Sequence, residues 1–252
     1  MTKKLIWAIA LLSIIIACKN KETTTAPSEA AKSDTVGAKK EPQAISNPLV
    51  THIYTADPSA HVFNDKIYIY PSHDYDYGVK EDDLGSHFDM KDYHILSMDS
   101  IDGPVTDHGV ALDIKDVPWA GRQMWAPDAA FANNKYYLYF PVKDKKDIFR
   151  IGVATSSSPA GPFKAENQPI KGSYSMDPAV FKDDDGSYYM YFGGIWGGQL
   201  QRWMTGKYDT TGIEPRDDRP ALGPKVAKMS KDMLQFAEPV KEVRIVDATG
   251  NP

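Results

Sequence analysis

The chain has 252 residues, of which 42% are hydrophobic and 25% charged, with 34 acidic and 29 basic side chains. This is ordinary globular composition, and a single Cys excludes a small disulfide-stapled module. The net charge of −5, without a basic cluster, argues against a nucleic-acid-binding protein but allows a neutral polymer such as a polysaccharide as partner.

The N-terminus has the pattern of an export signal. Lys3 and Lys4 precede an apolar run that continues to Ala17 and ends at Cys18. The run is too short to span a bilayer and has the charged head and apolar body of a secretory signal.

The segment 15–18, Ile-Ile-Ala-Cys, resembles a bacterial lipobox, in which a peptidase cuts before the Cys and a lipid is attached to it. We therefore expect residues 1–17 to be a lipoprotein signal peptide and Cys18 to be lipidated. The protein would then be an exported bacterial lipoprotein, on the periplasmic or cell-surface side of a membrane. The alternatives are an ordinary signal peptide with a chance Cys, or a short uncleaved anchor.

Residues 18–47 are predicted to form a disordered tether. From 19 onward they contain no aromatic and almost no large apolar side chain, so they cannot offset the entropy lost on ordering. Two basic residues precede Cys18, and the stretch 19–47 holds five basic and four acidic ones, so residues 48–252 retain 22 basic and 30 acidic residues, a net charge of −8. The domain from 48 to 252 is thus more acidic than the whole chain.

Within 48–252 one pattern occurs three times: a short apolar strand, a polar Asn/Asp/Gly turn and a Tyr-rich strand. Such a pattern predicts a β-hairpin. A further strand ending in a polar turn follows each copy. The copies are 56–70, 126–140 and 176–192, and the following strands are 94–98, 151–155 and 226–230.

Repeated three- or four-stranded units without helical periodicity indicate an all-β propeller, with a flat sandwich as the weaker alternative. Asp57 and Asp177 are 120 residues apart over two repeats, so residues 48–252 hold three to four blades. Residues 245–252 are predicted to be a strand that runs into a turn. We expect an incomplete propeller.

Asp-Pro pairs head two of the repeats, at Asp57 and Asp177, and Pro-Asp at Asp128 heads the third. Because the first strand of a propeller blade lies nearest the axis, these carboxylates should converge on one pocket. Paired carboxylates are what acid/base hydrolysis of a glycosidic bond requires. The alternative is that the three residues only cap turns.

The three runs TADPSAHVFNDKIYIY, WAPDAAF with KYYLYF, and SMDPAVFKDDDGSYYMYFGG resemble glycoside hydrolase family 43. The resemblance covers about residues 48–252. It implies a five-bladed propeller, of which this chain holds the first three to four blades, and inverting hydrolysis of arabinosyl or xylosyl linkages in plant-type polysaccharides. It also implies α-L-arabinofuranosidase or β-xylosidase activity on xylan or arabinan.

The resemblance implies that Asp57 is the general base and Asp177 the carboxylate that tunes the pKa of the acid. The family's general acid is a Glu that heads a later segment, and no such segment is found. Glu238 is a superficial candidate only, and Glu242 is no better, so the chain alone is expected to be inactive. The resemblance implies no required cofactor, with a structural calcium or similar ion only in the complete propeller, near an axial His of a later blade.

Other candidates are weaker. Trp125 and Trp196 are predicted to bind substrate by stacking on sugar rings, together with Asp128, although a Trp in a β-protein is more often core. The long acidic loop 74–92 is either functional or a solvated excursion. Asp183–Gly186 favours a hairpin turn over a calcium loop. No metal site is predicted, since the histidines have no metal-ligand spacing (His61, His73, His87 and His94).

Two further functions stay open from the sequence. A propeller that has kept its fold and lost its chemistry would be a non-catalytic glycan-binding lipoprotein. A glycoside phosphorylase on a similar propeller would need a basic phosphate pocket, of which the acidic sequence shows no sign.

Overall fold

The structure is a computed structural model that describes residues 47–212 and 220–251. The predicted signal peptide, the lipidated Cys18 and nearly all of the predicted tether lie outside the described residues. Within these ranges no helix has the length and apolar character needed to cross a membrane.

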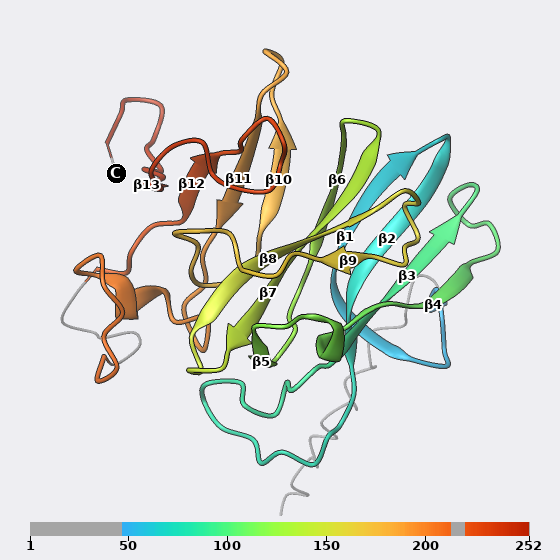
Figure 1. Cartoon of the computed structure of the whole chain (residues 1–252), viewed down its shortest axis with the longest axis horizontal. Coiled ribbons are helices and arrows are strands. Elements are labelled where there is room, and N and C mark those ends of the chain that lie inside the picture. The colour runs from blue at the N-terminus through green and yellow to red at the C-terminus, as the bar shows by residue number, and fades with distance from the viewer. Residues whose placement is uncertain (1–46, 213–219, 252) are drawn as a thin grey trace, which may run out of the picture. The chain divides into compact units, whose positions relative to one another are not determined.

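The described residues form three antiparallel sheets, one after another along the chain (Figure 1). The first has the order β1-β2-β3-β4, with bounds Tyr54–Phe63, Lys66–Asp74, Asp92–Met98 and Thr106–Asp113. The second has the order β5-β7-β8-β9, with β6 also paired to β7, and bounds Ala120–Arg122, Asp128–Ala132, Lys135–Asp144, Phe149–Ser156 and Lys164–Ala165 for β5 to β9. The third has the order β10-β11-β12-β13, with bounds Ala179–Lys182, Tyr188–Phe192, Lys225–Lys228 and Lys241–Glu242.

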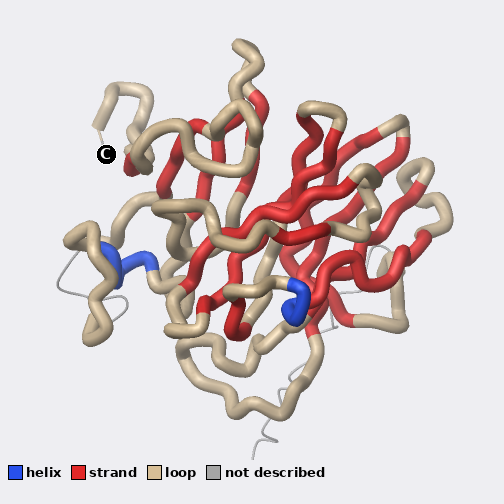
Figure 2. The backbone as a smooth tube through the Cα atoms, viewed as in Figure 1, coloured by secondary structure: helices blue, strands red, loops and turns tan. Residues whose placement is uncertain are grey.

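The remaining structure is loop, apart from two short 3₁₀ helices (Figure 2). These are η1 at Ile114–Asp116 and η2 at Leu200–Trp203. A long loop without regular structure runs from 75 to 91 and joins β2 to β3 within the first sheet.

The three predicted hairpins are confirmed. In the first two, both turn residues adopt the left-handed conformation, with φ of 52° and 61° at Asn64 and Asp65, and 51° and 56° at Asn133 and Asn134. Two consecutive left-handed residues make the tight turn that matches strand twist, and Asn and Asp tolerate it best. The segment Asp183–Gly186 is the third hairpin turn, also as predicted.

The central strand β7 shows how the sheets pack as blades. Its alternate residues face opposite ways, as in any strand. Leu138 and Phe140 pack with Tyr70 and Tyr93 of the first sheet, whereas Tyr139 packs on the other side with Met190 of the third sheet. Both faces of the middle sheet are therefore buried against its neighbours.

One strand of each sheet lies next to a strand of the neighbouring sheet, β1 beside β6 and β6 beside β10. This radial arrangement is that of propeller blades and not of a two-layer sandwich. The predicted fold class is confirmed, and the described residues form three blades, the lower end of the predicted three to four.

One predicted element is wrong. Ile245 and Val246 were expected to begin a strand, but they lie in irregular structure, 75% and 47% exposed. The last strand is β13, earlier in the chain, where Lys241 and Glu242 pair with β12. An apolar β-branched pair favours a strand only where a neighbouring strand supplies hydrogen bonds, and none of the described residues does so here. The predicted turn at the end is present.

Candidate active site

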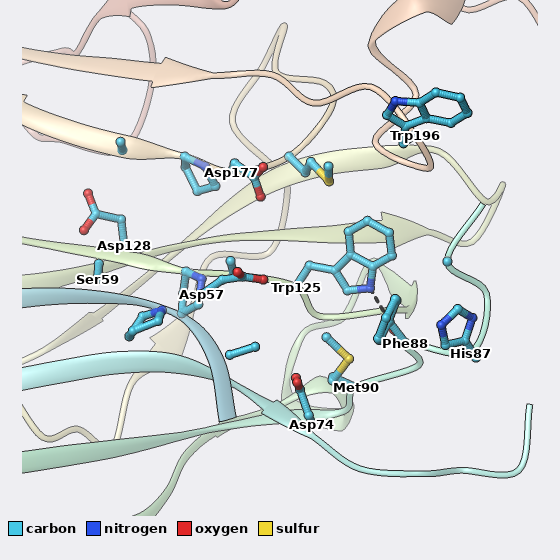
Figure 3. A pocket seen from close by; sticks show the side chains of 18 of the residues that line it. Asp57, Ser59, Asp74, His87, Phe88, Met90, Trp125, Asp128, Asp177 and Trp196 are labelled. Atoms are coloured by element: carbon cyan, nitrogen blue, oxygen red, sulfur yellow. Dashed lines mark hydrogen bonds between the residues drawn. The ribbon is translucent and has the colours of Figure 1, made fainter. Parts of the chain in front are cut away.

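A cavity of about 690 Å³ lies near the starts of β1, β6 and β10, one strand from each blade. Each blade contributes an equivalent four-residue segment to its lining: 56–59, 125–128 and 176–179. The structure thus brings together the three aspartates predicted from the sequence, Asp57, Asp128 and Asp177 (Figure 3). Their chemical roles stay predictions.

Asp57 and Asp177 are held by an unusual backbone. Their φ angles are 46° and 54°, in the left-handed region that L-residues rarely adopt. At Asp57 the β1–β2 register also shifts between Ala56 and Ser59, which is a β-bulge. Bulges redirect side chains, and residues strained in this way cluster at functional sites. The two carboxylates therefore point into the cavity because the backbone turns them there.

The electrostatics of the cavity differ from one carboxyl to the next. The pKa of Asp177 is raised from 3.8 to about 6, first because the carboxyl is removed from water and then because the charge of Asp57 repels a second negative charge. Asp177 as a residue is exposed, and it lines the cavity.

The first cause of the raised pKa of Asp74 is also burial, and the charge of Asp57 adds to it. Asp74 stands at the end of β2 and lines the same cavity. Asp57 therefore lies between two carboxyls that hold their protons more tightly than usual. A carboxyl whose pKa is raised in this way keeps its proton to a higher pH than an ordinary aspartate does.

Asp128 is committed to protein contacts. It is 5% exposed. Its Oδ1 lies 2.7 Å from Nε2 of His61 in β1, and its Oδ2 accepts a 2.6 Å hydrogen bond from the backbone N–H of Val180 in β10. One carboxylate thus joins β6 to β1 and β10, so it connects all three blades. Its predicted role in substrate binding stays a prediction, and the hydrogen bonds give it a structural role.

The two predicted tryptophans both line the cavity but differ in exposure. Trp125 is 9% exposed, and its ring centroid lies 4.8 Å from that of Phe149. Its Nε1–H donates a hydrogen bond to the carbonyl of Phe88. Trp196 is 61% exposed. Its neighbour Gly197 is needed for close approach, because a Cβ there would lie 2.4 Å from the carbonyl oxygen of Leu84. Trp196 is therefore the side chain more available to a ligand.

The loop 75–91, whose role the sequence left open, supplies six lining residues. They include Asp82, His87, Phe88 and Met90. Sequence reasoning named none of these individually as part of a site, and its only signal was the length of the loop. Asp74 was also missed as a lining residue, because it is the last residue of β2 and the other blades do not repeat its motif.

Glu238 and Glu242 do not line the cavity. Glu238 pairs with Lys241 at 2.9 Å, and Glu242 pairs with Lys225. The cavity lining contains no Glu, Lys or Arg among the described residues.

Fold and cavity define a β-propeller whose blades direct carboxylates into one sugar-sized pocket. Residues 45–248 match the family model described as glycosyl hydrolases family 43. The chain belongs to that family.

The chain is also similar in sequence to individual proteins. The chain is 58% identical over 214 residues to Xylosidase/arabinosidase 43A of Humicola insolens, a match covering 81% of this chain and 65% of the relative. It is 54% identical over 205 residues to a xylosidase/arabinosidase of Bacteroides ovatus, covering 81% and 63%. The chain thus spans a little under two thirds of these relatives.

A solved structure is also similar. It is CoXyl43, a family 43 β-xylosidase/α-arabinofuranosidase from a compost microbial metagenome, in complex with xylotriose and in a calcium-free form. It is 73% identical to this chain with a TM-score of 0.79, and the match covers 82% of this chain and 64% of that one.

Proposed function

We propose that this chain carries the general base of a glycoside hydrolase active site, which acts on xylosyl or arabinosyl linkages in plant-type polysaccharides. The observation that carries the proposal is the convergence of Asp57 and Asp177, both with left-handed backbones, on one cavity. The names of the relatives, β-xylosidase and α-arabinofuranosidase, support the sugar class.

In the proposed inverting reaction, Asp57 accepts a proton from water while the water oxygen attacks the anomeric carbon. The bond to the leaving oxygen breaks, and a general acid protonates that oxygen. Asp177, through its charge and position, would tune the pKa of that acid, as the family resemblance implies. The family resemblance implies a structural calcium or similar ion only in the complete propeller, near an axial His of a later blade.

The proposal assigns no general acid within the described residues. Glu238 and Glu242 are paired with lysines outside the cavity. Loss of a general acid typically lowers rates by about 10² to 10⁴. We therefore expect the 252-residue chain alone to hydrolyse aryl xylosides or arabinofuranosides slowly or not at all.

A fusion protein tests the proposal. Residues 1–252 would be joined to the C-terminal part of the compost-metagenome relative that lies beyond the match, and release of nitrophenol from aryl β-xyloside and α-L-arabinofuranoside would be measured. Turnover by the fusion and not by the chain alone is expected. A folded fusion that binds xylotriose without turnover would contradict the enzyme and favour the alternative, a non-catalytic glycan-binding propeller.

We also propose that the protein is an exported lipoprotein held on a membrane through Cys18. The support is the sequence alone: the charged head, the short apolar run and the lipobox-like segment 15–18. Expression in a bacterium with labelled palmitate should label the wild type, and Cys18→Ser should lose both the label and membrane fractionation. Labelling that persists in Cys18→Ser would refute the anchor.

A further inference from the structure

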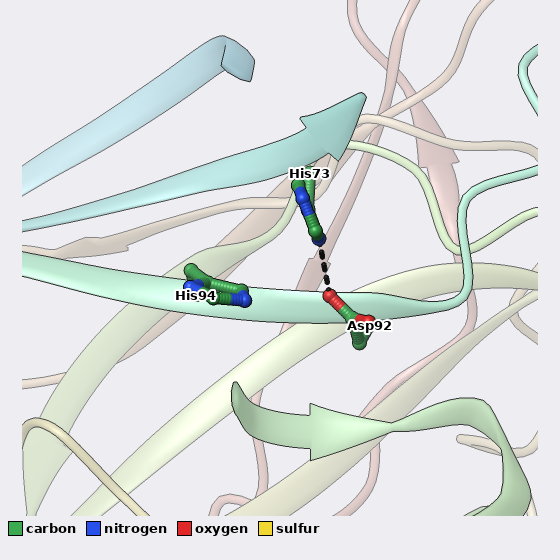
Figure 4. A group of neighbouring side chains, drawn as sticks. All are labelled: His73, Asp92 and His94. Carbon is green, nitrogen blue, oxygen red and sulfur yellow. Dashed lines mark hydrogen bonds and ion pairs between the residues drawn. The ribbon is translucent and has the colours of Figure 1, made fainter. Parts of the chain in front are cut away.

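Three side chains of the first blade form a compact cluster outside the active-site cavity (Figure 4). They are His73 at the end of β2, and Asp92 and His94 at the start of β3. Each offers one ligand atom, and these atoms all lie within 4.8 Å of one another. Nδ1 of His73 is 2.6 Å from Oδ1 of Asp92, and the rings of His73 and His94 have centroids 4.6 Å apart.

Strand geometry explains the cluster. Ile69 pairs with Leu96 in the antiparallel β2–β3 ladder, and continuing this register places His73 opposite Asp92. Asp92 and His94 are two residues apart in one strand, so their side chains lie on the same face. The sequence did not predict a metal site because His73 is separated from the other two by the loop 75–91.

A carboxylate behind the cluster fixes one imidazole. Nδ1 of His94 lies 3.0 Å from Oδ1 of Asp107, whose Oδ2 is 2.7 Å from Nε2 of His52. Asp107 is itself held by the backbone N–H of Gly109 at 2.8 Å. A histidine that gives its Nδ1–H to a carboxylate presents Nε2 as a lone-pair donor, which is how metal-binding histidines are usually oriented.

The remaining requirements are donor type and access. Two imidazole nitrogens and one carboxylate oxygen suit a first-row divalent transition ion, with Zn²⁺ as the usual choice, and not Ca²⁺, which prefers oxygen. The three side chains are 15%, 17% and 14% exposed, so solvent ions can reach them. Without an ion, the same groups form an ordinary His–Asp ion-pair network, and this is the competing explanation.

We propose that His73, Asp92 and His94 form a binding site for a divalent transition-metal ion such as Zn²⁺, with Asp107 as a positioning residue for His94. The ion would take the place of the hydrogen bond between Nδ1 of His73 and Oδ1 of Asp92. Because His73 and Asp92 stand at the two ends of the loop 75–91, the ion would also tie together the base of the loop that lines the cavity. The proposal does not depend on the proposed hydrolase function.

Calorimetric titration with Zn²⁺ tests the site. It would use the purified, untagged 252-residue chain, treated with chelator and carrying Cys18→Ser, so that the only thiol is absent. One saturable site is expected. His94→Gln should weaken binding at least tenfold, and Asp107→Asn about 10- to 100-fold, the usual effect of removing a supporting carboxylate.

His108→Gln is the matched control, since His108 lies in the same blade and contacts Ser97 but not the cluster. It should bind Zn²⁺ as the parent does. Two further measurements distinguish loss of a metal ligand from loss of folding. The first is the visible absorption of bound Co²⁺. The second is thermal melting: Zn²⁺ should raise the melting temperature of the parent but not that of His94→Gln, whose melting without metal should stay cooperative. No saturable binding, or equal affinity in a folded His94→Gln, would overturn the proposal.

Discussion

Asp57 and Asp177 occupy the same position in two different blades, and both adopt a left-handed backbone directly before a proline, with φ of 46° and 54°. The residue before a proline is normally extended. Two independent departures from that preference, both ending in the same cavity, indicate that the fold holds these carboxylates against a local backbone cost.

That cost is measurable by comparing Asp57→Gly with Asp57→Ala. Both variants lose the carboxylate, but only Gly adopts positive φ without strain. We expect Asp57→Gly to be more stable than Asp57→Ala by about 1 kcal/mol. Urea unfolding followed by circular dichroism gives the difference. Equal stability of the two variants would show that the site stores no backbone strain.

Stability should depend on pH through Asp177. Its pKa in the folded chain is raised from 3.8 to about 6, so the folded state binds this proton more tightly than the unfolded state. The resulting stabilisation is complete below about pH 4 and is lost as the pH rises through 6. Between about pH 4 and pH 6 the urea midpoint of the parent should fall, and in Asp177→Asn this fall should be smaller. Parallel pH profiles for parent and variant would refute the raised pKa.

Asp128 should matter for folding. Asp128→Ala would leave the N–H of Val180 and the ring of His61 without their shared acceptor across three blades. The expected loss is about 3 kcal/mol of unfolding free energy, as for other broken buried pairs. Asp184→Ala in the exposed third hairpin turn is the control and should stay within about 0.5 kcal/mol of the parent. If Asp128→Ala loses no more unfolding free energy than Asp184→Ala, Asp128 has no structural role.

Trp196 should contribute to sugar binding without supporting the fold, because it is 61% exposed at the cavity edge. Trp196→Ala should weaken xylotriose binding by roughly 2- to 10-fold, the equivalent of one aromatic contact. Calorimetry would measure the affinity and thermal melting the stability. Unchanged affinity in the variant would exclude a stacking role.

The sequence predicted much of the fold for identifiable reasons. Hairpin turns such as Asn133-Asn134 are fixed by local conformational preference, and Asp57 and Asp177 could be placed together because a repeated motif implies a repeated position. The features that the sequence did not predict depend on contacts between residues far apart in the chain. Asp74 and the cluster of His73 with His94 arise from strand pairing across a long loop, and Ile245 was expected to be in a strand although no described strand pairs with it.

Asp57 is proposed to act as the general base in this cavity. The direct measurement compares Asp57→Asn with Asp184→Asn in the fusion with the C-terminal part of the compost-metagenome relative, using hydrolysis of aryl β-xyloside. Asp57→Asn should lower turnover by about 10² or more while the protein stays folded, and Asp184→Asn should keep the parent rate. A folded Asp57→Asn fusion that turns over at the parent rate would show that Asp57 is not the base.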